Sequence, residues 1–148
     1  MKKEYNNMSL YELINSNGNK LYKGASEQLI NGFESIFNFK LPSEYKELLK
    51  YTNGADLFNG DITLYSLFDE NVSVKHCNLL GNANSPIVKK NIPNELLVIG
   101  IYNFGDLICI NLNNGNIVQW SHDDNEIFLE YPNIREWLIS SVEEMDLV

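Results

Sequence analysis

The densest group of side chains that could do chemistry is the run Asp123-Asp124-Asn125-Glu126. Neighbouring carboxylates can exchange protons in acid–base catalysis or bind calcium through their oxygens. The run lacks the Asp-x-Asp-x-Asp-Gly order and the later Glu of a calcium loop. Asn111-x-Asn113-Asn114-Gly115 resembles that order only loosely. An acidic loop after a strand is therefore the favoured interpretation, and a hydrolase that uses this cluster stays as the enzyme alternative.

Thiol and imidazole groups are few and badly spaced for a site. His76 and Cys77 are adjacent, whereas Cys109 and His122 lie far along the chain, and no C-x2-C or H-x3-H spacing exists. Cys109 stands in an apolar run, and burial there would raise the pKa of its thiol rather than activate it. Phosphate-binding glycine loops are absent. We expect two reduced core thiols, no metal, no cofactor and no enzymatic activity.

The charge is unevenly distributed. The chain has 148 residues and a net charge of −9, and residues 1–90 hold ten acidic and ten basic side chains. Residues 91–148 hold ten acidic side chains and one basic one, Arg135, which accounts for the whole excess. Nucleic acid and anionic lipid would be repelled, so we expect neither as a partner. The pattern favours a basic protein partner, and the alternative is an acidic face that only maintains solubility.

The composition is that of one globular domain, with 44% hydrophobic and 21% charged residues. We predict a single domain over 1–148 with its core at about 20–142. No apolar run approaches the roughly 18 residues of a membrane span, and no signal peptide is visible, so we expect a cytoplasmic location. Nothing indicates a homo-oligomer, although an exposed strand edge could support one.

Three helices are expected in the first third of the chain. Ser9 and Glu12 form a capping box before the first helix. Ser26 caps the second, whose predicted buried stripe is Leu29, Ile30, Phe33, Ile36 and Phe37. The third begins near 41–43 and ends at Asn53-Gly54, because glycine accepts the left-handed conformation. Its expected buried residues are Tyr45, Leu48 and Leu49.

Strands are expected in the remainder. A short strand over 62–67 is followed by a helical or irregular stretch from Asp69 to Leu80, and then by a loop over 81–95. Strands over 96–102, 107–112 and 117–121 form a meander, with a type I′ turn at Asn114-Gly115. A helix from about Pro132 to Glu144 closes the chain, with Ile134, Trp137, Leu138 and Val142 facing inward. This order predicts the α+β class with a mostly antiparallel sheet.

Together these segments resemble the SUKH superfamily over about residues 20–142. The motif LP-x-x-Y-x-x-(F/L)-L…NG reads here as Leu41-Pro42-Ser43-Glu44-Tyr45-Lys46-Glu47-Leu48-Leu49 with Thr52-Asn53-Gly54. The preceding (I/F)E helix is matched by Phe33-Glu34, and the closing helix by Trp137-Leu138. The family also has a later motif, (V/I)IG…GD-x-(I/L)-C-(L/I)-(D/N)…G-x-(V/I)…(W/Y)-x-H-(D/E). It is matched by Val98-Ile99-Gly100, Gly105-Asp106-Leu107-Ile108-Cys109-Ile110-Asn111, Gly115-Asn116-Ile117-Val118 and Trp120-Ser121-His122-Asp123.

The resemblance implies a compact domain without enzymatic activity. Many bacterial members neutralise polymorphic toxins, often nucleases, by binding the toxin domain, whereas fungal relatives act as interaction hubs in cell-wall regulation. A nuclease domain is commonly basic, so the resemblance strengthens the case for an acidic binding face. The alternative is an interaction module or scaffold that has no toxin partner.

The candidate partner-binding residues are acidic side chains and two aromatic anchors. The acidic candidates are Asp56, Asp61, Asp106, Asp123, Asp124 and Glu126, and the aromatic candidates are Tyr102 and Trp120. Two of these have structural alternatives. Trp120 could be a core residue of its strand, and Asp106 could serve the conformation of its turn.

Overall fold

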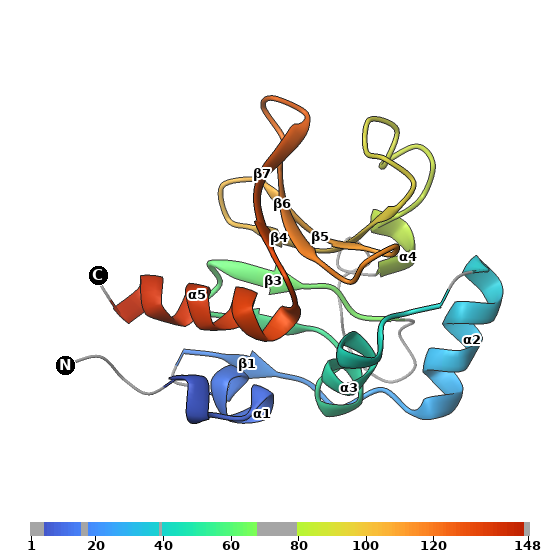
Figure 1. Ribbon diagram of the computed structural model, residues 1–148. Coiled ribbons are helices and arrows are strands. Elements are labelled where there is room, and N and C mark those ends of the chain that lie inside the picture. Colours follow the sequence, from blue (N-terminus) through green and yellow to red (C-terminus); the bar gives the residue numbers. More distant parts are fainter. Residues whose placement is uncertain (1–4, 16–17, 39, 68–79, 147–148) are drawn as a thin grey trace.

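The computed structural model describes residues 5–15, 18–38, 40–67 and 80–146. Its described residues form one antiparallel sheet with the strands in chain order, covered by helices, which confirms the α+β class (Figure 1). The strands are β1 (Lys20–Leu21), β2 (Ala55–Leu57), β3 (Ile62–Leu64), β4 (Leu96–Tyr102), β5 (Leu107–Asn111), β6 (Ile117–Ser121) and β7 (Glu126–Tyr131). The helices are the 3-10 helix η1 (Tyr5–Asn7), α1 (Leu10–Ile14), α2 (Glu27–Phe37), α3 (Ser43–Tyr51), α4 (Leu80–Ala83) and α5 (Ile134–Asp146).

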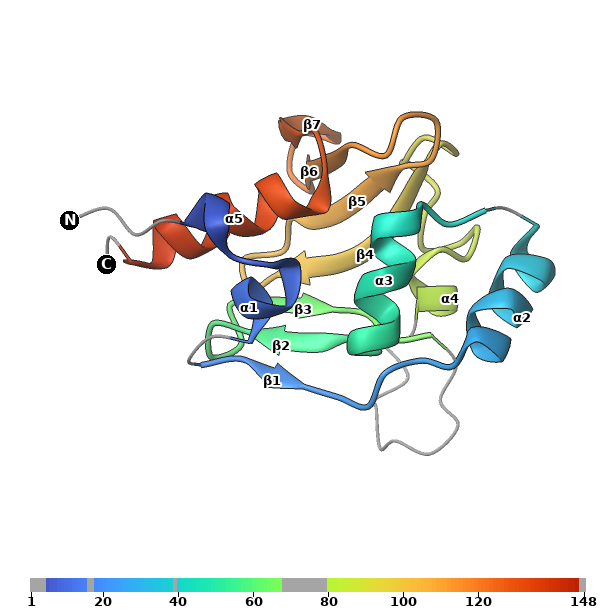
Figure 2. The same cartoon turned by 60° about the horizontal axis from the view of Figure 1, so that its bottom comes forward.

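Helices α1, α3 and α5 lie in front of the sheet in Figure 2, while α2 stands beyond one end of the strands. Local signals fix where these helices begin. The Ser9 hydroxyl accepts a hydrogen bond from the backbone of Glu12 at 3.0 Å, and the Glu12 carboxylate accepts one from the backbone of Ser9 at 2.9 Å. The predicted capping box is therefore confirmed. Ser26 caps α2 in the same way, through the backbone N–H of Leu29 at 3.1 Å.

The buried face of α2 differs from the predicted stripe. Ile36 is 68% exposed, whereas Glu34, which is not part of the predicted stripe, is only 7% exposed. The Glu34 carboxylate accepts a hydrogen bond from the backbone of Leu41 at 2.6 Å and lies 3.6 Å from Lys46 Nζ. A buried carboxylate needs such partners. The buried face of α2 therefore includes Glu34 in place of Ile36.

Helix α3 ends where the Asn-Gly pair predicts. Gly54 has a φ of +88°, a conformation that other residues rarely adopt. The side chain of Asn53 accepts a hydrogen bond from the backbone of Leu67 at 2.8 Å, and Ser66 Oγ donates to the Asn53 carbonyl at 2.7 Å. The end of α3 is thereby joined to the segment that leaves β3. The predicted buried face, Tyr45, Leu48 and Leu49, is confirmed.

The meander agrees with prediction in its strands and differs in one turn. Strands β4 and β6 have the predicted bounds, β5 ends one residue early, and β3 ends at Leu64. The type I′ turn is wrong, because only Gly115 of the Asn-Gly pair has a positive φ. In the predicted loop over 81–95, α4 continues to Ala83. The stretch predicted from Asp69 lies mostly outside the described residues.

Strands β1, β2 and β7 were not predicted. Strand β7 begins at Glu126, at the end of the run that the sequence interprets as an acidic loop. It pairs with β6 and forms the last strand of the sheet. The final helix α5 turns all four predicted residues into the core: Ile134, Trp137, Leu138 and Val142.

Candidate functional site

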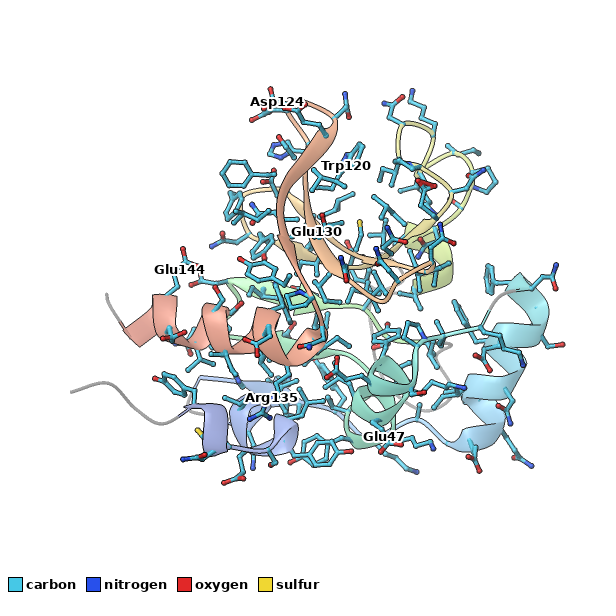
Figure 3. The ribbon with its side chains drawn as sticks, viewed as in Figure 1. Glu47, Trp120, Asp124, Glu130, Arg135 and Glu144 are labelled. Atoms are coloured by element: carbon cyan, nitrogen blue, oxygen red, sulfur yellow. The ribbon has the colours of Figure 1, made fainter. Side chains whose placement is uncertain are left out.

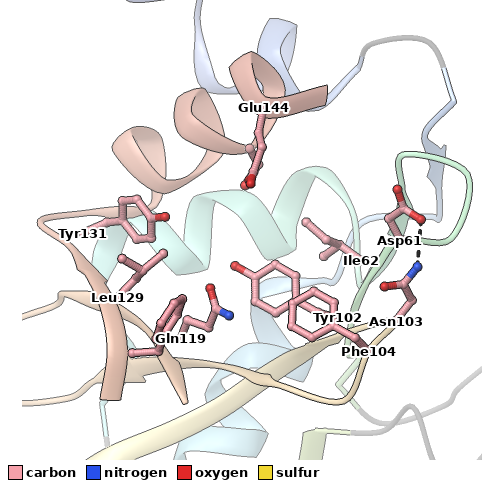
Figure 4. A pocket seen from close by; sticks show the side chains of 11 residues that line it. Asp61, Ile62, Tyr102, Asn103, Phe104, Gln119, Leu129, Tyr131 and Glu144 are labelled. Atoms are coloured by element: carbon pink, nitrogen blue, oxygen red, sulfur yellow. Dashed lines mark hydrogen bonds between the residues drawn. The ribbon is translucent and has the colours of Figure 1, made fainter. Parts of the chain in front are cut away.

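A cavity of about 420 Å³ opens at the β7 side of the sheet. Its walls come from the turns that follow β2 and β4, from β6 and β7, and from the C-terminal part of α5 (Figure 4). These segments are far apart in the sequence. They are Asp61 and Ile62, Tyr102 to Phe104, Gln119, Phe128, Leu129 and Tyr131, and Ser141 and Glu144.

Aromatic side chains form the apolar part of this cavity. The rings of Tyr102 and Phe104 stack with their centroids 5.2 Å apart and their planes at 15°. The Tyr102 hydroxyl accepts a hydrogen bond from Trp137 Nε1 at 3.0 Å, which anchors it to α5. Burial raises the pKa of Tyr102 to about 12, and the nearby Glu144 contributes to the rise. Phe104 is 58% exposed and Phe128 65% exposed, so the cavity continues into an apolar surface.

The polar groups of the cavity are mainly hydrogen-bond acceptors. The Asp61 carboxylate accepts a hydrogen bond from Asn103 Nδ2 at 2.9 Å. Glu144 extends its carboxylate toward the Tyr102 ring in Figure 4. The buried side chain of Gln119 donates its amide N–H to Asp106 at 2.8 Å. No Lys, Arg or His side chain is among the described residues that line the cavity.

A carboxylate–imidazole pair lies beside the cavity and organises the turn between β6 and β7. His122 Nδ1 is 2.6 Å from Asp106 Oδ1, and the His122 backbone donates to the same oxygen at 3.2 Å. Burial by itself raises the pKa of Asp106, yet the hydrogen bonds from Gln119 and His122 outweigh it and hold that pKa below its usual value. The hydrogen bond to Asp106 raises the pKa of His122.

The acidic run lies at the tip of this turn. Asp123, Asp124 and Glu126 are all exposed, and Asp124 occupies the far end of the hairpin in Figure 3. Asp123 Oδ1 is 3.4 Å from His122 Nε2, whereas no described residue forms an ion pair with Asp124 or Glu126. Arg135 lies far from the turn in Figure 3 and donates to the Tyr5 carbonyl at 3.4 Å. The carboxylates of Asp124 and Glu126 therefore stay uncompensated, whereas Asp123 has a partner when His122 is protonated.

The structure separates the sequence-predicted residues into four groups. Asp61 and Tyr102 share the cavity, and the three acidic residues of the turn lie together. Asp56 lies on β2, where it accepts a hydrogen bond from the Tyr22 hydroxyl at 2.8 Å, apart from both. Trp120 is only 6% exposed and belongs to the core, and the Asp106 carboxylate is used within its turn. The structural alternatives for these two residues therefore fit better than a surface role.

Sequence reasoning missed several residues of the cavity, above all Phe104, Phe128, Leu129 and Glu144. One signal was available for β7. The segment from Glu126 to Tyr131 contains Ile127, Phe128 and Tyr131, which are residue types that favour strands. Glu144 carried no such signal, because only the packing of α5 brings it to the cavity.

Other chemistry receives no support from the described part of the chain. No group of three His, Cys, Asp or Glu side chains there could hold a metal ion. Cys109 is fully buried, and burial raises the pKa of its thiol to about 12, the direction that the sequence predicts. His76 and Cys77 lie outside the described residues. None of the described helices is long and apolar enough to cross a membrane.

Comparison with known proteins identifies relatives of the chain. The model of the SMI1 / KNR4 family (SUKH-1) matches residues 24–140. A crystal structure of a protein from Pseudomonas syringae pv. tomato is similar in fold, with a TM-score of 0.61 and 17% sequence identity over 79% of this chain and 81% of that one. No curated protein matches the sequence.

Proposed function

Because the chain belongs to the SMI1 / KNR4 family (SUKH-1), we propose that it is an immunity protein that binds and neutralises a cognate polymorphic toxin domain. The partner is a basic domain, such as a nuclease, and it docks on the acidic surface formed by the β6–β7 turn. The protein acts in the cytoplasm by one-to-one binding, without a cofactor and without enzymatic activity of its own.

The observation that supports this proposal most is the exposed negative charge of the turn. Asp123, Asp124 and Glu126 are exposed at the tip of a hairpin. Arg135, the one basic residue of 91–148, donates a hydrogen bond to Tyr5 instead. A hairpin held by the Asp106–His122 pair presents these carboxylates in a defined place. Preorganised charge of this kind costs little to bring into a complex.

The physical mechanism is competition for a basic surface. A nuclease must hold phosphates with lysine and arginine side chains. Carboxylates on a protein can occupy the same side chains and steer the two proteins together. The exposed apolar residues beside the turn, Ile127, Phe128 and Leu129, supply contact area that charge alone does not give.

A pull-down from cells that encode the protein tests the proposal. Tagged protein serves as bait, mass spectrometry identifies the captured proteins, and the wash is done at low and at high salt. We expect one basic toxin-domain protein, retained at low salt and weakened at high salt. Capture of cell-envelope or regulatory proteins alone would favour the scaffold alternative instead.

A charge-matched pair of variants then locates the binding surface. The triple variant Asp123→Asn, Asp124→Asn, Glu126→Gln should lose affinity for the captured toxin domain and lose protection in co-expression. The control triple Glu95→Gln, Glu136→Gln, Glu143→Gln removes the same charge from other exposed positions and should retain both. Equal losses in the two triples would show that only net charge matters.

A further inference from the structure

The cavity beside the acidic turn has an unusual polar lining. The Asp106 carboxylate can only accept hydrogen bonds, so Gln119 must present its amide nitrogen to it. The amide oxygen of Gln119 is then left for the cavity, where no described residue donates to it. Among the described residues only Tyr45 Oη is both buried and without a hydrogen-bond partner, so the Gln119 oxygen remains accessible from the cavity. The cavity therefore offers an oriented acceptor that an incoming donor can reach.

The other groups around this oxygen have the same preference. Glu144 turns its carboxylate toward the Tyr102 ring, and Asp61 adds a second carboxylate on the other side of the cavity in Figure 4. The stacked rings of Tyr102 and Phe104 present π-faces. Acceptors, negative charge and aromatic faces all select a planar cation that has several N–H donors.

We propose that this cavity receives an arginine side chain of the partner protein, with its guanidinium against the Tyr102–Phe104 rings and its N–H groups bonded to Gln119 and Glu144. This inference rests on the proposed function, because the arginine belongs to the basic domain that docks on the acidic turn. The cavity anchors that domain, while the turn attracts it.

Two other occupants fit the cavity less well. A lysine ammonium has neither the planar shape nor the fork of donors that would use the rings and the two acceptors together. A second copy of this chain would align β7 against β7, and in the antiparallel register centred on Phe128 Glu126 of one copy faces Glu130 of the other. Like charges that face each other across strands are unfavourable.

A peptide titration tests the inference without any toxin. The isotope-labelled full chain is titrated with acetyl-Gly-Arg-Gly-amide, and NMR follows the side-chain amide of Gln119 and the backbone amides of Phe104 and Tyr131. We expect saturable shifts with a Kd on the order of millimolar. The same peptide with citrulline, which has the shape of arginine but no charge, should bind about fivefold more weakly or less.

Two variants with matched controls complete the test. Glu144→Gln should weaken binding of the arginine peptide about two- to fivefold, as for a partly exposed ion pair, while Glu143→Gln, its exposed neighbour on α5, should not. Phe104→Ala should weaken binding as well, because it removes one of the two rings against which the guanidinium is proposed to lie. Ile87→Ala, at another exposed position, should not weaken binding.

The inference and the proposed function can fail separately. Equal binding of the arginine and citrulline peptides, or no saturable shift at Gln119, would overturn the inference, even if the pull-down captures a toxin domain. Conversely, arginine-selective shifts at Gln119 would uphold the cavity's preference, even if the pull-down captures only a basic scaffold partner. In that case the immunity role fails and the recognition chemistry stands.

Discussion

At the scale of single residues, the Asp106–His122 pair shows how one carboxylate organises a site. Asp106 lies in the turn after β4 and accepts hydrogen bonds from Gln119 on β6 and from both the ring and the backbone of His122. It therefore fixes the amide orientation of Gln119 on one side and the start of the acidic turn on the other. Asp106 therefore contributes to binding indirectly, because it positions Gln119 and His122.

The pair makes the stability of the protein depend on pH. Asp106 raises the pKa of His122 above its usual value of about 6.5. A raised folded-state pKa gives stability that is fully present below the unfolded pKa and is lost as pH rises through the folded one. His122→Gln should therefore lower the free energy of unfolding more at about pH 5 than at about pH 9. Urea denaturation at the two pH values measures this.

The lowered pKa of Asp106 does not cancel this effect, because its stabilisation is present above the usual carboxylate pKa and is lost only as pH falls through the lowered value. Both groups are thus charged near pH 5. In an Asp106→Asn background, the cost of His122→Gln should differ less between the two pH values, because Asp123 is then the remaining carboxylate that raises the pKa of His122. A difference of undiminished size would assign the pH dependence to another group.

At the scale of elements, strand β7 connects the acidic turn to the cavity, because its residues follow the turn and line the cavity. Gln119 pairs with Leu129 and Trp120 with Ile127, so Phe128 is the extra residue of a bulge. A bulge bends the strand and redirects side chains, and here both Phe128 and Leu129 line the cavity. As an edge strand, β7 also leaves one row of backbone groups available to a partner.

Close packing of neighbouring strands can be tested at Gly100. An added Cβ at this position in β4 would lie 2.5 Å from the Thr63 carbonyl oxygen of β3, which is backbone and cannot turn away. Gly100→Ala should therefore lower the free energy of unfolding by about 1–3 kcal/mol. The matched control is Gly32→Ala within α2, where a Cβ meets nothing within 4 Å.

The control should change stability in the opposite direction, by about 0.5–1 kcal/mol, because alanine favours the helix and restricts the unfolded chain. Thermal and urea denaturation of the two variants measure both values. If Gly100→Ala were as stable as the wild type, β3 and β4 would have to separate more easily than their pairing indicates.

At the scale of the whole molecule, the helices and the acidic turn lie at different parts of the sheet. Helices α1, α3 and α5 cover one face, and the acidic turn projects at the β7 side, with Asp124 at its tip (Figure 3). The net charge of −9 comes from residues 91–148, which include the acidic turn. The field of the molecule therefore favours approach of a basic partner to this side.

Association with the captured basic domain should depend strongly on salt. Raising the ionic strength from about 0.01 M to about 0.5 M shortens the Debye length severalfold, so the association rate constant should fall at least about tenfold. Stopped-flow mixing measures this rate, and the dissociation rate constant should change less. An association rate that does not respond to salt would contradict electrostatic steering.

Elements with local signals could be predicted from the order of the residues. Capping residues and apolar periodicity predicted α1, α2, α3 and α5, and alternation and turn residues predicted the β4–β6 meander. The charge count predicted an acidic surface but not which residues form it. The motif around Leu41-Pro42 and Asn53-Gly54 identified the family, which the match over residues 24–140 confirms. Each of these depends on residues that are neighbours along the chain.

The tertiary structure alone decided the rest, because the deciding partners are distant in sequence. Strands β1 and β2 are only two and three residues long and exist through their pairing with each other and with β3. Glu34 can be buried because its carboxylate accepts a hydrogen bond from the backbone of Leu41 and forms an ion pair with Lys46. The cavity brings together Asp61, Tyr102, Gln119 and Glu144. No periodicity in the sequence predicts that these four residues lie close together, because their proximity depends on how α5 and β7 pack against the sheet.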